Sequence, residues 1–256
     1  MTPRKFGSSA AFSQTAAAYA ATMAPALAPV AAEVVRRAAL GPNETVLDIG
    51  TGTGTAARLA LGEGRRVIGL DAAAGMLEIA RRDVPGVEFL EADFTRIPLA
   101  DGSVQAVLAV HALLFADDRV AALREWLRVT VPGGRLSLSV PGPGDVVPSA
   151  VFGEVYDRYG IEWAADDYPQ PSAVVQWATD AGWTGVTGDA EPTSAIPLTD
   201  ETAFRVWLRV GRMVTDWSAD RVAAFGDDLM AVSPRGPDGS FRIPFGSIHL
   251  TARNAR

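Results

Sequence analysis

The strongest constraint on the fold of this chain is a regular alternation of strand-like and helix-like stretches between residues 45 and 140. Apolar strand patterns occur at residues 45–50, 66–71, 87–93, 104–111 and 134–140, with helical patterns at 54–61, 74–82 and 117–129. Strands that alternate with helices form βαβ units, and near-continuous apolar strands are typical of a sheet covered on both faces. The sequence therefore predicts an α/β protein with a doubly wound, mostly parallel sheet.

The chain extends this alternation on both sides, without an internal repeat or a low-complexity tract. Two helices are predicted near the N-terminus, over residues 10–23 and 30–40, because Pro25 and Pro29 would break a single helix. The later segments are predicted as a helix, a strand, two helices and a final strand, at residues 172–182, 183–189, 200–217, 219–231 and 247–253. We therefore expect a single domain over residues 1–256.

Composition narrows the kinds of partner. Lys and Arg number 23 and Asp and Glu 30, giving a net charge of −7. This balance argues against DNA or RNA, because polyanions are bound by clustered cations. Cysteine is absent, which excludes a thiolate nucleophile and cysteine-bound metals, and the two histidines, His111 and His249, are too far apart for a metal-binding pair. We expect neither nucleic acid nor a metal ion.

The N-terminal segment does not match a secretory signal. Its apolar stretch is interrupted by Ser13, Gln14 and Thr15, whereas a signal needs a continuous one. No run is expected to be apolar over the length of a membrane span. A soluble, cytoplasmic protein without a membrane partner is therefore predicted.

The segment VLDIGTGTG, from Val46 to Gly54, places three alternating glycines at the first turn from strand to helix. Open α/β sheets bind ligands at this edge, and glycine lets a ligand approach the backbone. A dinucleotide pyrophosphate is one candidate, with the spacing G-x-G-x-x-G. From Gly50 this chain has G-x-G-x-G, one residue shorter. A tight turn that binds nothing is the alternative.

Two acidic residues follow at the ends of the next two strands. Asp71 ends the second strand in GLDAAAGML, where a carboxylate can accept hydrogen bonds from both hydroxyls of a ribose. Asp93 ends the third strand in FLEADF, near the place of a nucleoside base. With the glycine turn, these acids favour a nucleoside cofactor at the carboxyl edge of the sheet.

The motifs VLDIGTGTG, GLD, EADFTRIPLADGS and VPGG together resemble those of the class I S-adenosylmethionine (SAM)-dependent methyltransferases. They are most similar to the small-molecule group that includes the ubiquinone and menaquinone C-methyltransferases. The resemblance covers residues 10–190 well and the C-terminal part weakly. It implies a Rossmann-like sheet of seven strands with 247–253 antiparallel, VPGG as the turn before the fifth strand, and SAM as cofactor. The implied activity is methyl transfer to a small organic acceptor by direct displacement.

The resemblance also implies which residues hold the cofactor. The turn formed by Gly50, Thr51, Gly52 and Gly54 would approach the amino-acid part of SAM, and Asp48 would lie near its ammonium group. For Asp48, a purely structural role as a cap or turn residue is the alternative.

The nucleoside part of SAM would be held by later residues and by the N-terminal helix. Asp71 would bind the ribose hydroxyls, and Met76 would pack beside the adenine. Asp93 would accept from the adenine amino group, with the backbone of Phe94 contacting the ring, and Tyr19 would close over the cofactor. The structural alternatives are a helix N-cap for Asp71, a core residue for Met76, a solvated loop acid for Asp93 and a core aromatic for Tyr19.

His111 is the candidate catalytic residue, because it follows the fourth strand, whose carboxyl end adjoins the methyl group in this family. A histidine that titrates near neutrality suits removal of a proton from an acceptor. It could instead line the cofactor pocket or be structural. His249, in the last strand, is expected to be structural.

The cover of the acceptor is expected after the fifth strand. In the family, segments there cover the substrate, which implies a division into N-terminal helices at 1–40, a SAM-binding core at 41–141 and covers at 142–170 and 200–232. Five of the six tryptophans follow residue 160, and an aromatic-rich cover would suit a flat or apolar acceptor.

Three other functions are open on the sequence. A SAM-site enzyme could catalyse another reaction, such as a cyclisation, and a protein with this fold could bind the cofactor without catalysis. A nicotinamide-dependent oxidoreductase is the third, although the short glycine spacing and the Asp93 motif count against it. The sequence indicates neither the acceptor atom nor the oligomeric state.

Overall fold

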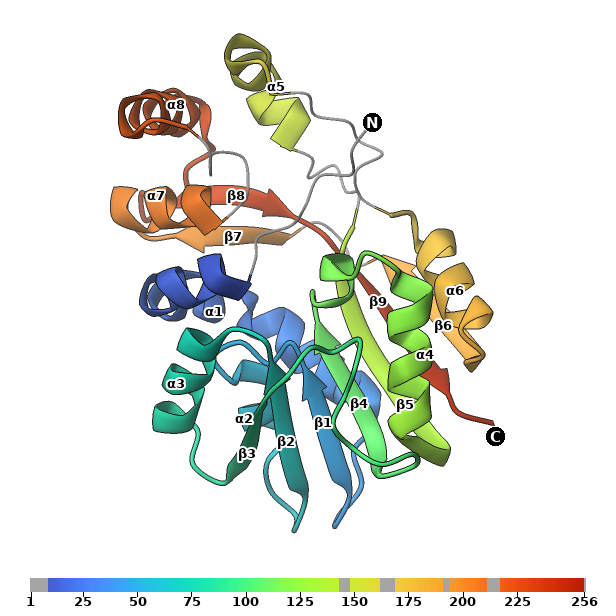
Figure 1. The fold of residues 1–256 in the computed structure, drawn as a ribbon. Coiled ribbons are helices and arrows are strands. Elements are labelled where there is room, and N and C mark those ends of the chain that lie inside the picture. Colours follow the sequence, from blue (N-terminus) through green and yellow to red (C-terminus); the bar gives the residue numbers. More distant parts are fainter. Residues whose placement is uncertain (1–8, 143–147, 162–168, 191–193, 211–216, 256) are drawn as a thin grey trace.

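The computed structural model describes residues 9–142, 148–161, 169–190, 194–210 and 217–255. Its main sheet has seven strands in the order β3-β2-β1-β4-β5-β9-β6 (Figure 1). The order reverses between β1 and β4, which is the switch point where open α/β sheets bind ligands. The predicted doubly wound, mostly parallel sheet is confirmed.

Five of these strands run parallel and form the predicted alternation, namely β1 (Thr45–Ile49), β2 (Arg66–Asp71), β3 (Val87–Glu91), β4 (Val104–Val110) and β5 (Thr130–Pro141). Strand β9 (Ser247–Arg253) pairs antiparallel with β5 and with β6 (Thr184–Ala190), as the family resemblance implies. The VPGG segment lies inside β5, where the pairing with β4 jumps from Thr130 to Arg135. It is therefore an irregularity within the strand and not a turn before it.

Helices cover both faces of the sheet. Alternate residues of the strands form two apolar clusters, one with α4 (Arg119–Val129) and α6 (Pro171–Asp180) and the other with α1 (Ser9–Ala38) and α2 (Thr55–Ala60). Helix α3 (Ala74–Asp83) packs against the N-terminal turns of α1, and the short helix η1 (Leu113–Phe115) follows β4. Both faces being covered explains why the strands are apolar at almost every position.

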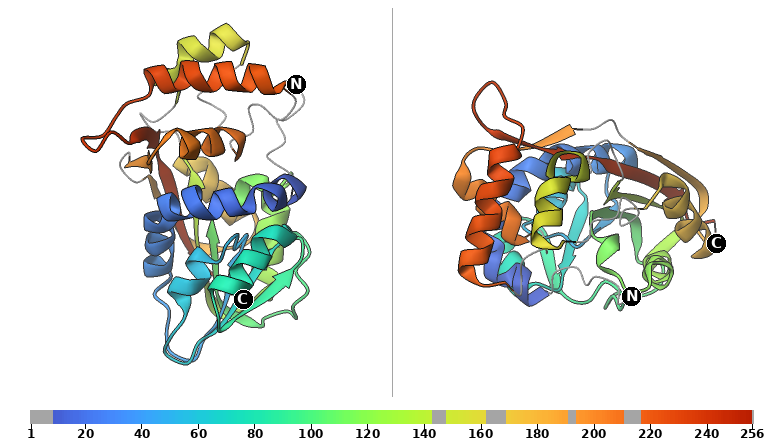
Figure 2. Two further views of the ribbon diagram at one scale, coloured as in Figure 1. Left: turned by 90° about the vertical axis from the view of Figure 1, so that its left-hand side faces the viewer. Right: turned by 90° about the horizontal axis from the view of Figure 1, so that it is seen from above.

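Helix α1 is a single helix, so the predicted break at Pro25 and Pro29 is wrong. Both prolines are exposed, whereas Met23, Leu27 and Val30 on the opposite side of the helix are buried. The apolar stripe continues across the prolines, and its burial outweighs the backbone hydrogen bonds that they remove. Figure 2 shows a bend between the two halves of the helix, which is the usual effect of internal proline.

Helix α1 also has the length and composition of a membrane span, with a mean hydropathy of 1.3 over its most apolar window. The prediction that no segment reaches this length is therefore wrong. In this structure the helix packs against α2, α3, β4 and β5, and Ser137 Oγ of β5 donates a hydrogen bond to the Val34 carbonyl oxygen at 2.7 Å. The buried side chains on its inner side, among them Met23, Leu27, Val30 and Val34, are thus core residues of the domain.

A second layer lies beyond the carboxyl ends of the strands and consists of α5 (Pro148–Tyr159), α7 (Glu201–Val210), α8 (Ala219–Val232) and the two-stranded sheet of β7 (Ser194–Leu198) and β8 (Phe241–Phe245) (Figures 1 and 2). We call these five elements the cover. Its core joins Phe152, Phe204 and Phe225 to Met23 and Leu27 of α1. The strands β7 and β8 were not predicted, and residues 143–147, 162–168 and 211–216 of the expected covers lie outside the described residues.

Candidate functional site

The glycine turn after β1 adopts a backbone that only glycine accepts easily. Gly50 and Gly52 have φ values of 63° and 55°. A Cβ atom on Gly50 would lie 2.6 Å from the Cβ of Ala112, whereas one on Gly52 would meet nothing within 4 Å. Gly50 is therefore required by packing, and Gly52 leaves its backbone open on one side.

Asp48 is buried at the end of β1 and braces the turn. Its Oδ2 atom accepts hydrogen bonds from Thr51 Oγ1 at 2.6 Å and from the Ala57 backbone N–H at 3.0 Å. Only 1% of the residue is exposed, and this burial raises the pKa of its carboxyl group to about 7, against the lowering effect of these two bonds. The structural alternative is therefore realised in part, because one oxygen orders the first turn of α2. The other carboxylate oxygen, Oδ1, accepts no hydrogen bond from another described residue.

Asp71 joins the end of β2 to the glycine turn. Its Oδ2 accepts from the Gly52 backbone N–H and its Oδ1 from the Ala73 N–H, each at 2.8 Å. Asp71 is not the N-cap of α3, because Ala73 occupies that position. Burial raises the pKa of the Asp71 carboxyl group, against the lowering effect of the backbone bonds. A carboxylate has about four acceptor positions, so Asp71 can still accept from a ligand hydroxyl beside its backbone bonds.

The N-terminal turns of α1 lie over this edge of the sheet. Tyr19 packs in a cluster with Met76, and its ring meets that of Phe12 edge-to-face at 6.4 Å. Burial, with a smaller contribution from the charge of Asp71, raises the pKa of Tyr19 to about 12, so its hydroxyl stays protonated. The Gly75 N–H donates to Ser13 Oγ at 3.3 Å, which ties α1 to the start of α3. Met76 is 2% exposed and is a core residue in this structure.

A pocket of about 380 Å³ of empty space, part of it open to solvent, lies between α1 and the glycine turn. Its walls include Tyr19, Leu27 and Ala31 of α1 and Val110 of β4, and its floor includes Asp48 and the turn from Gly50 to Gly52. Sequence reasoning missed Leu27, Ala31 and Val110. The repeat of apolar residues at 23, 27, 30 and 34 is the signal that could have placed Leu27 on the inner face of α1.

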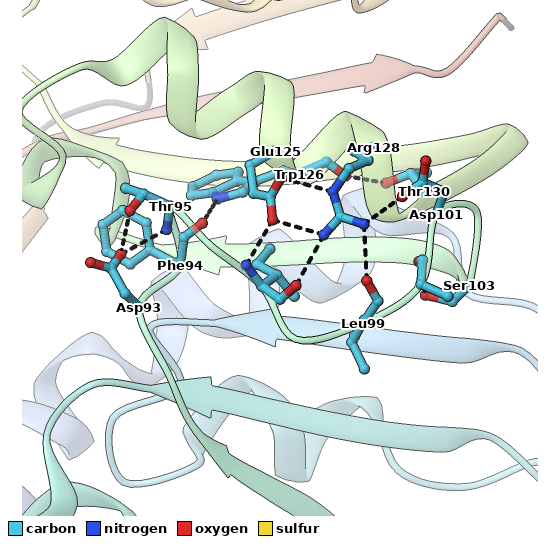
Figure 3. Close-up of polar contacts among 12 residues, drawn as sticks. Asp93, Phe94, Thr95, Leu99, Asp101, Ser103, Glu125, Trp126, Arg128 and Thr130 are labelled. Carbon is cyan, nitrogen blue, oxygen red and sulfur yellow. Dashed lines mark hydrogen bonds and ion pairs between the residues drawn. The ribbon is translucent and has the colours of Figure 1, made fainter.

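Asp93 lies outside this pocket, in the exposed loop after β3 (Figure 3). Its Oδ1 accepts from the backbone N–H and the hydroxyl of Thr95, each at 2.7 Å, and so forms a local turn. The Phe94 carbonyl oxygen accepts from Trp126 Nε1 at 3.1 Å, and the Phe94 ring meets the Trp126 ring edge-to-face. Helix α4 therefore fixes this loop, and the second oxygen of Asp93 takes no part in the turn.

The rest of this loop is held by one charged residue of α4 that the sequence did not single out. Arg128 donates to the carbonyl oxygens of Ile97 and Leu99 at 3.0 and 2.9 Å, and pairs with Asp101 and Glu125 (Figure 3). Glu125 in turn accepts from the Ile97 N–H at 2.7 Å. The segment IPLAD is thus braced from α4, which fixes the edge of the sheet next to Asp93.

His111 follows β4 with a left-handed backbone, φ 54°, which is uncommon for a residue with a side chain. Its N–H donates to the Ser139 carbonyl oxygen at 2.9 Å, and its Nε2 lies 3.1 Å from Ser247 Oγ. Burial, with a smaller effect of His249, lowers the pKa of His111 to about 3. The ring is therefore neutral at physiological pH. His249 lies in β9 and is fully buried.

The structure brings five of the expected cofactor residues together in the pocket, namely Tyr19, Asp48, Gly50, Thr51 and Gly52. Asp71 is one hydrogen bond away, through Gly52. The other expected site residues, Gly54, Met76, Asp93, Phe94 and His111, do not line the pocket.

The residues present fit SAM. The open backbone at Gly52 admits a close ligand, and the buried acid Asp48, on the pocket floor, suits an ammonium group. Asp71 can accept from ribose hydroxyls while it keeps its two backbone bonds. The apolar side chains of Tyr19 and Leu27 in the pocket wall would suit the uncharged parts of the cofactor.

Comparisons with known proteins show the family. The family model for a methyltransferase domain matches residues 47–138. A demethylmenaquinone methyltransferase of Beutenbergia cavernae is 35% identical over 57% of this chain and 68% of its own length. A malonyl-[acyl-carrier protein] O-methyltransferase of Serratia marcescens is 33% identical over 57% of this chain and 56% of its own length.

Solved structures show the same fold. One from Bacillus halodurans, described as a methyltransferase, covers 88% of this chain and 99% of its own with a TM-score of 0.60 at 20% sequence identity. At 20% identity this structural similarity shows the fold alone. The assignment to a family of methyltransferases rests on the sequence relatives. The glycine turn, the acids at the ends of β1 and β2 and these relatives lead to one conclusion: the chain belongs to the class I SAM-dependent methyltransferases.

Proposed function

We propose that this methyltransferase holds SAM between the glycine turn and α1, and that it methylates an apolar small molecule bound under the cover. The observation that carries the proposal is the continuity of one apolar cluster. Leu27 belongs to the core of the cover and also lines the pocket above Asp48. A molecule that reaches the cofactor from the cover would therefore meet apolar side chains.

The cofactor is oriented by the chain's own acids. Asp48 would accept from the ammonium group through Oδ1, because Oδ2 is engaged by Thr51 and Ala57. Asp71 would accept from the ribose hydroxyls, and the loop braced by Arg128 would present Asp93 to the base. The cofactor supplies an electrophilic methyl group, and the protein supplies position and exclusion of water.

The charges of the cover favour an uncharged acceptor over an acid. Each cover arginine whose side chain is described is already engaged with an acid, a ring or a carbonyl group, namely Arg158, Arg205, Arg221 and Arg242, and so is Arg235 in the connection between α8 and β8. A carboxylate acceptor would have to displace one of these contacts. Of the two kinds of acceptor that the relatives' names contain, demethylmenaquinone fits the cover better than a malonyl group.

For His111 we propose a role in shaping the acceptor pocket. A neutral ring with a pKa near 3 is a weak base at neutral pH, so proton removal by His111 would contribute little. The ring follows Val110, which lines the pocket, and it reaches the start of β9. Positioning of the acceptor is the role that this placement supports.

We also propose that the protein acts in the cytoplasm as a soluble enzyme without a nucleic-acid partner. The apolar stripe of α1 is used inside the domain, and the net charge of −7 does not favour a polyanion. Fractionation of the tagged protein between soluble and membrane pools tests this directly.

The acceptor is tested with three probes and SAM, using mass spectrometry to detect the methylated product. Chemically reduced demethylmenaquinone represents a flat apolar ring, malonyl-acyl-carrier protein an acid, and sarcosine a polar amine. We expect methylation of the reduced quinone, because its ring is electron-rich toward an electrophilic methyl group. Methylation of the malonyl group or of sarcosine, with none of the quinol, would contradict the proposal.

A further inference from the structure

Trp126 is a buried tryptophan of α4 whose indole N–H is bonded to the loop after β3. It is 0% exposed, and its Nε1 donates to the carbonyl oxygen of Phe94 at 3.1 Å, across 32 residues of sequence. An indole N–H can only donate, so the direction of this hydrogen bond is fixed. Trp126 therefore imposes an orientation on the peptide unit that carries the Phe94 oxygen.

That peptide unit links Trp126 to Asp93. It joins Phe94 to Thr95 and is planar and trans, so its C=O and its N–H point in opposite directions. The oxygen faces Trp126, and the N–H, which is that of Thr95, donates to Oδ1 of Asp93 at 2.7 Å (Figure 3). A single rigid unit thus separates the indole from the carboxylate, and in such a chain each hydrogen bond polarises the next.

One oxygen of Asp93 is fixed by these contacts and the other is left over. Oδ1 accepts a second hydrogen bond from the Thr95 hydroxyl at 2.7 Å, whereas no described residue donates to Oδ2. The loop is also tied to the cofactor edge, because the Ala92 N–H donates to the carbonyl oxygen of Asp71 at 3.0 Å. Oδ2 is therefore the oxygen of Asp93 that remains for a ligand.

We propose that Trp126 is a positioning residue for the base of the cofactor: through the Phe94–Thr95 peptide it aims Oδ2 of Asp93 at an amino group, and so sets the preference for adenine over a base with a carbonyl at the same place. This inference rests on the role of Asp93 in the proposed function. A carboxylate accepts from an amino group and repels a carbonyl oxygen, so its direction decides which base is bound. Trp126 lies in the core and acts only through the loop.

The test is calorimetric titration of the full chain with S-adenosylhomocysteine and with S-inosylhomocysteine, in which an oxygen replaces the amino group of the base. Wild type should bind the adenosyl compound at least about tenfold more tightly, because the other compound cannot donate to the charged carboxylate. Trp126→Phe keeps an apolar ring and removes the donor. It should weaken binding of S-adenosylhomocysteine about three- to tenfold and leave that of S-inosylhomocysteine within about twofold, so the preference for adenine falls.

Trp183→Phe is the matched control. Trp183 is 2% exposed in the same apolar cluster, and its indole N–H likewise donates to a backbone oxygen, that of Leu123, at 3.0 Å. Leu123 lies in α4 and not in the loop of Asp93, so this variant should lose stability without any change in base preference. An equal fall of the preference in Trp183→Phe would overturn the proposal, because it would trace the effect to a loosened core.

A second replacement separates the lost hydrogen bond from the lost volume. Benzothienylalanine has the shape of tryptophan with sulfur in place of the indole N–H, so its incorporation at residue 126 removes the donor and keeps the core filled, even if Trp126→Phe does not fold. The preference for adenine should fall here too. An unchanged preference in this protein, while wild type discriminates, would overturn the proposal and leave the proposed cofactor site standing. If wild type binds both compounds equally, the role of Asp93 in the proposed function fails and this proposal fails with it.

Discussion

The cofactor edge of the sheet and the cover are stabilised in different ways. At the ends of β1 and β2, Asp48 and Asp71 each accept two hydrogen bonds, three of them from backbone N–H groups. In the cover, the contact between α5 and α8 is an aromatic cluster in which Phe225 lies 5.0–6.0 Å from the rings of Tyr156, Tyr159 and Trp217. Arg158 and Tyr159 of α5 also bond to Asp228 of α8, but the buried rings of the cover are held by apolar packing, whereas the carboxylates of the first region are fixed by directional polar contacts.

This difference separates what each region can recognise. Hydrogen bonds to the backbone fix atoms in one geometry, which suits a cofactor whose structure never changes. Apolar packing is non-directional and tolerates exchange of side chains of similar volume, which suits a region where acceptors differ among relatives. We therefore expect that mutations can damage the two regions separately.

The largest effect is expected from Phe225→Ala, which removes a fully buried ring from the cover core. Such a change costs about 3–5 kcal/mol. Hydrogen exchange should show loss of protection in α5 and α8, with that of β1–β4 unchanged, and titration should show an unchanged affinity for S-adenosylhomocysteine. Leu123→Ala, a fully buried change in α4, should leave the protection of α5 and α8 intact. Loss of cofactor affinity in Phe225→Ala would break the distinction between the regions.

A smaller loss of stability is expected at the glycine turn. Gly50→Ala combines a left-handed backbone with a Cβ atom 2.6 Å from Ala112, at a cost of roughly 2–5 kcal/mol in denaturant unfolding. Gly52→Ala has the same backbone cost but meets no neighbour, so it should lose about 1–2 kcal/mol. Its Cβ would enter open space beside the ligand and weaken S-adenosylhomocysteine binding. Equal stability losses in the two variants would contradict this reading of the turn.

Acid should weaken cofactor binding through Asp48. The free protein holds this carboxyl group at a pKa of about 7, and an ammonium partner requires it ionised. Affinity should therefore be about 30-fold lower at about pH 5.5 than at about pH 8, and binding near neutrality should release a proton. Asp48→Asn should remove this pH dependence.

The same group makes a signed contribution to the stability of the free protein. Its folded-state pKa lies above the unfolded value of 3.8, so its contribution is fully present below that value and is lost as pH rises toward about 7. Denaturant melts should therefore show that the stability of wild type falls, relative to that of Asp48→Asn, as pH rises from 3.8 toward about 7. Parallel curves would show that the carboxyl group titrates normally.

The sheet could be predicted because its signals are local: each strand is followed within a few residues by its turn or helix. Asp48 and Asp71 lie at the ends of β1 and β2, where parallel strands present them to one edge, whereas Asp93, expected at the end of the third strand, lies in the loop after β3. The two-stranded ribbon of β7 and β8 could not be predicted, because each strand contains a proline, Pro197 and Pro244, and proline argues against a strand. A two-stranded ribbon accepts these prolines because each strand has a free edge.

Two further features depend on contacts between distant residues. Pro25 and Pro29 predict a break, and only the packing of α1 against the sheet and the cover shows why the helix continues. The contact between His111 and Ser247 joins the end of β4 to the start of β9, 136 residues apart, and no spacing in the sequence indicates it. The low pKa of His111 results from its burial in the fold. It could not be predicted from the presence of a histidine in the sequence.

We propose that acids fixed by the backbone at the ends of β1 and β2 hold SAM, and calorimetric titration of S-adenosylhomocysteine into Asp71→Ala tests this. The change should remove up to two charge-assisted hydrogen bonds of about 1.5–3 kcal/mol each and weaken binding at least about 100-fold. Asp93→Ala, at an exposed acid, should weaken it less, and denaturant melts should report the cost to the fold separately. An Asp71→Ala protein that binds S-adenosylhomocysteine as tightly as wild type would show that Asp71 only braces the glycine turn, and would contradict the account.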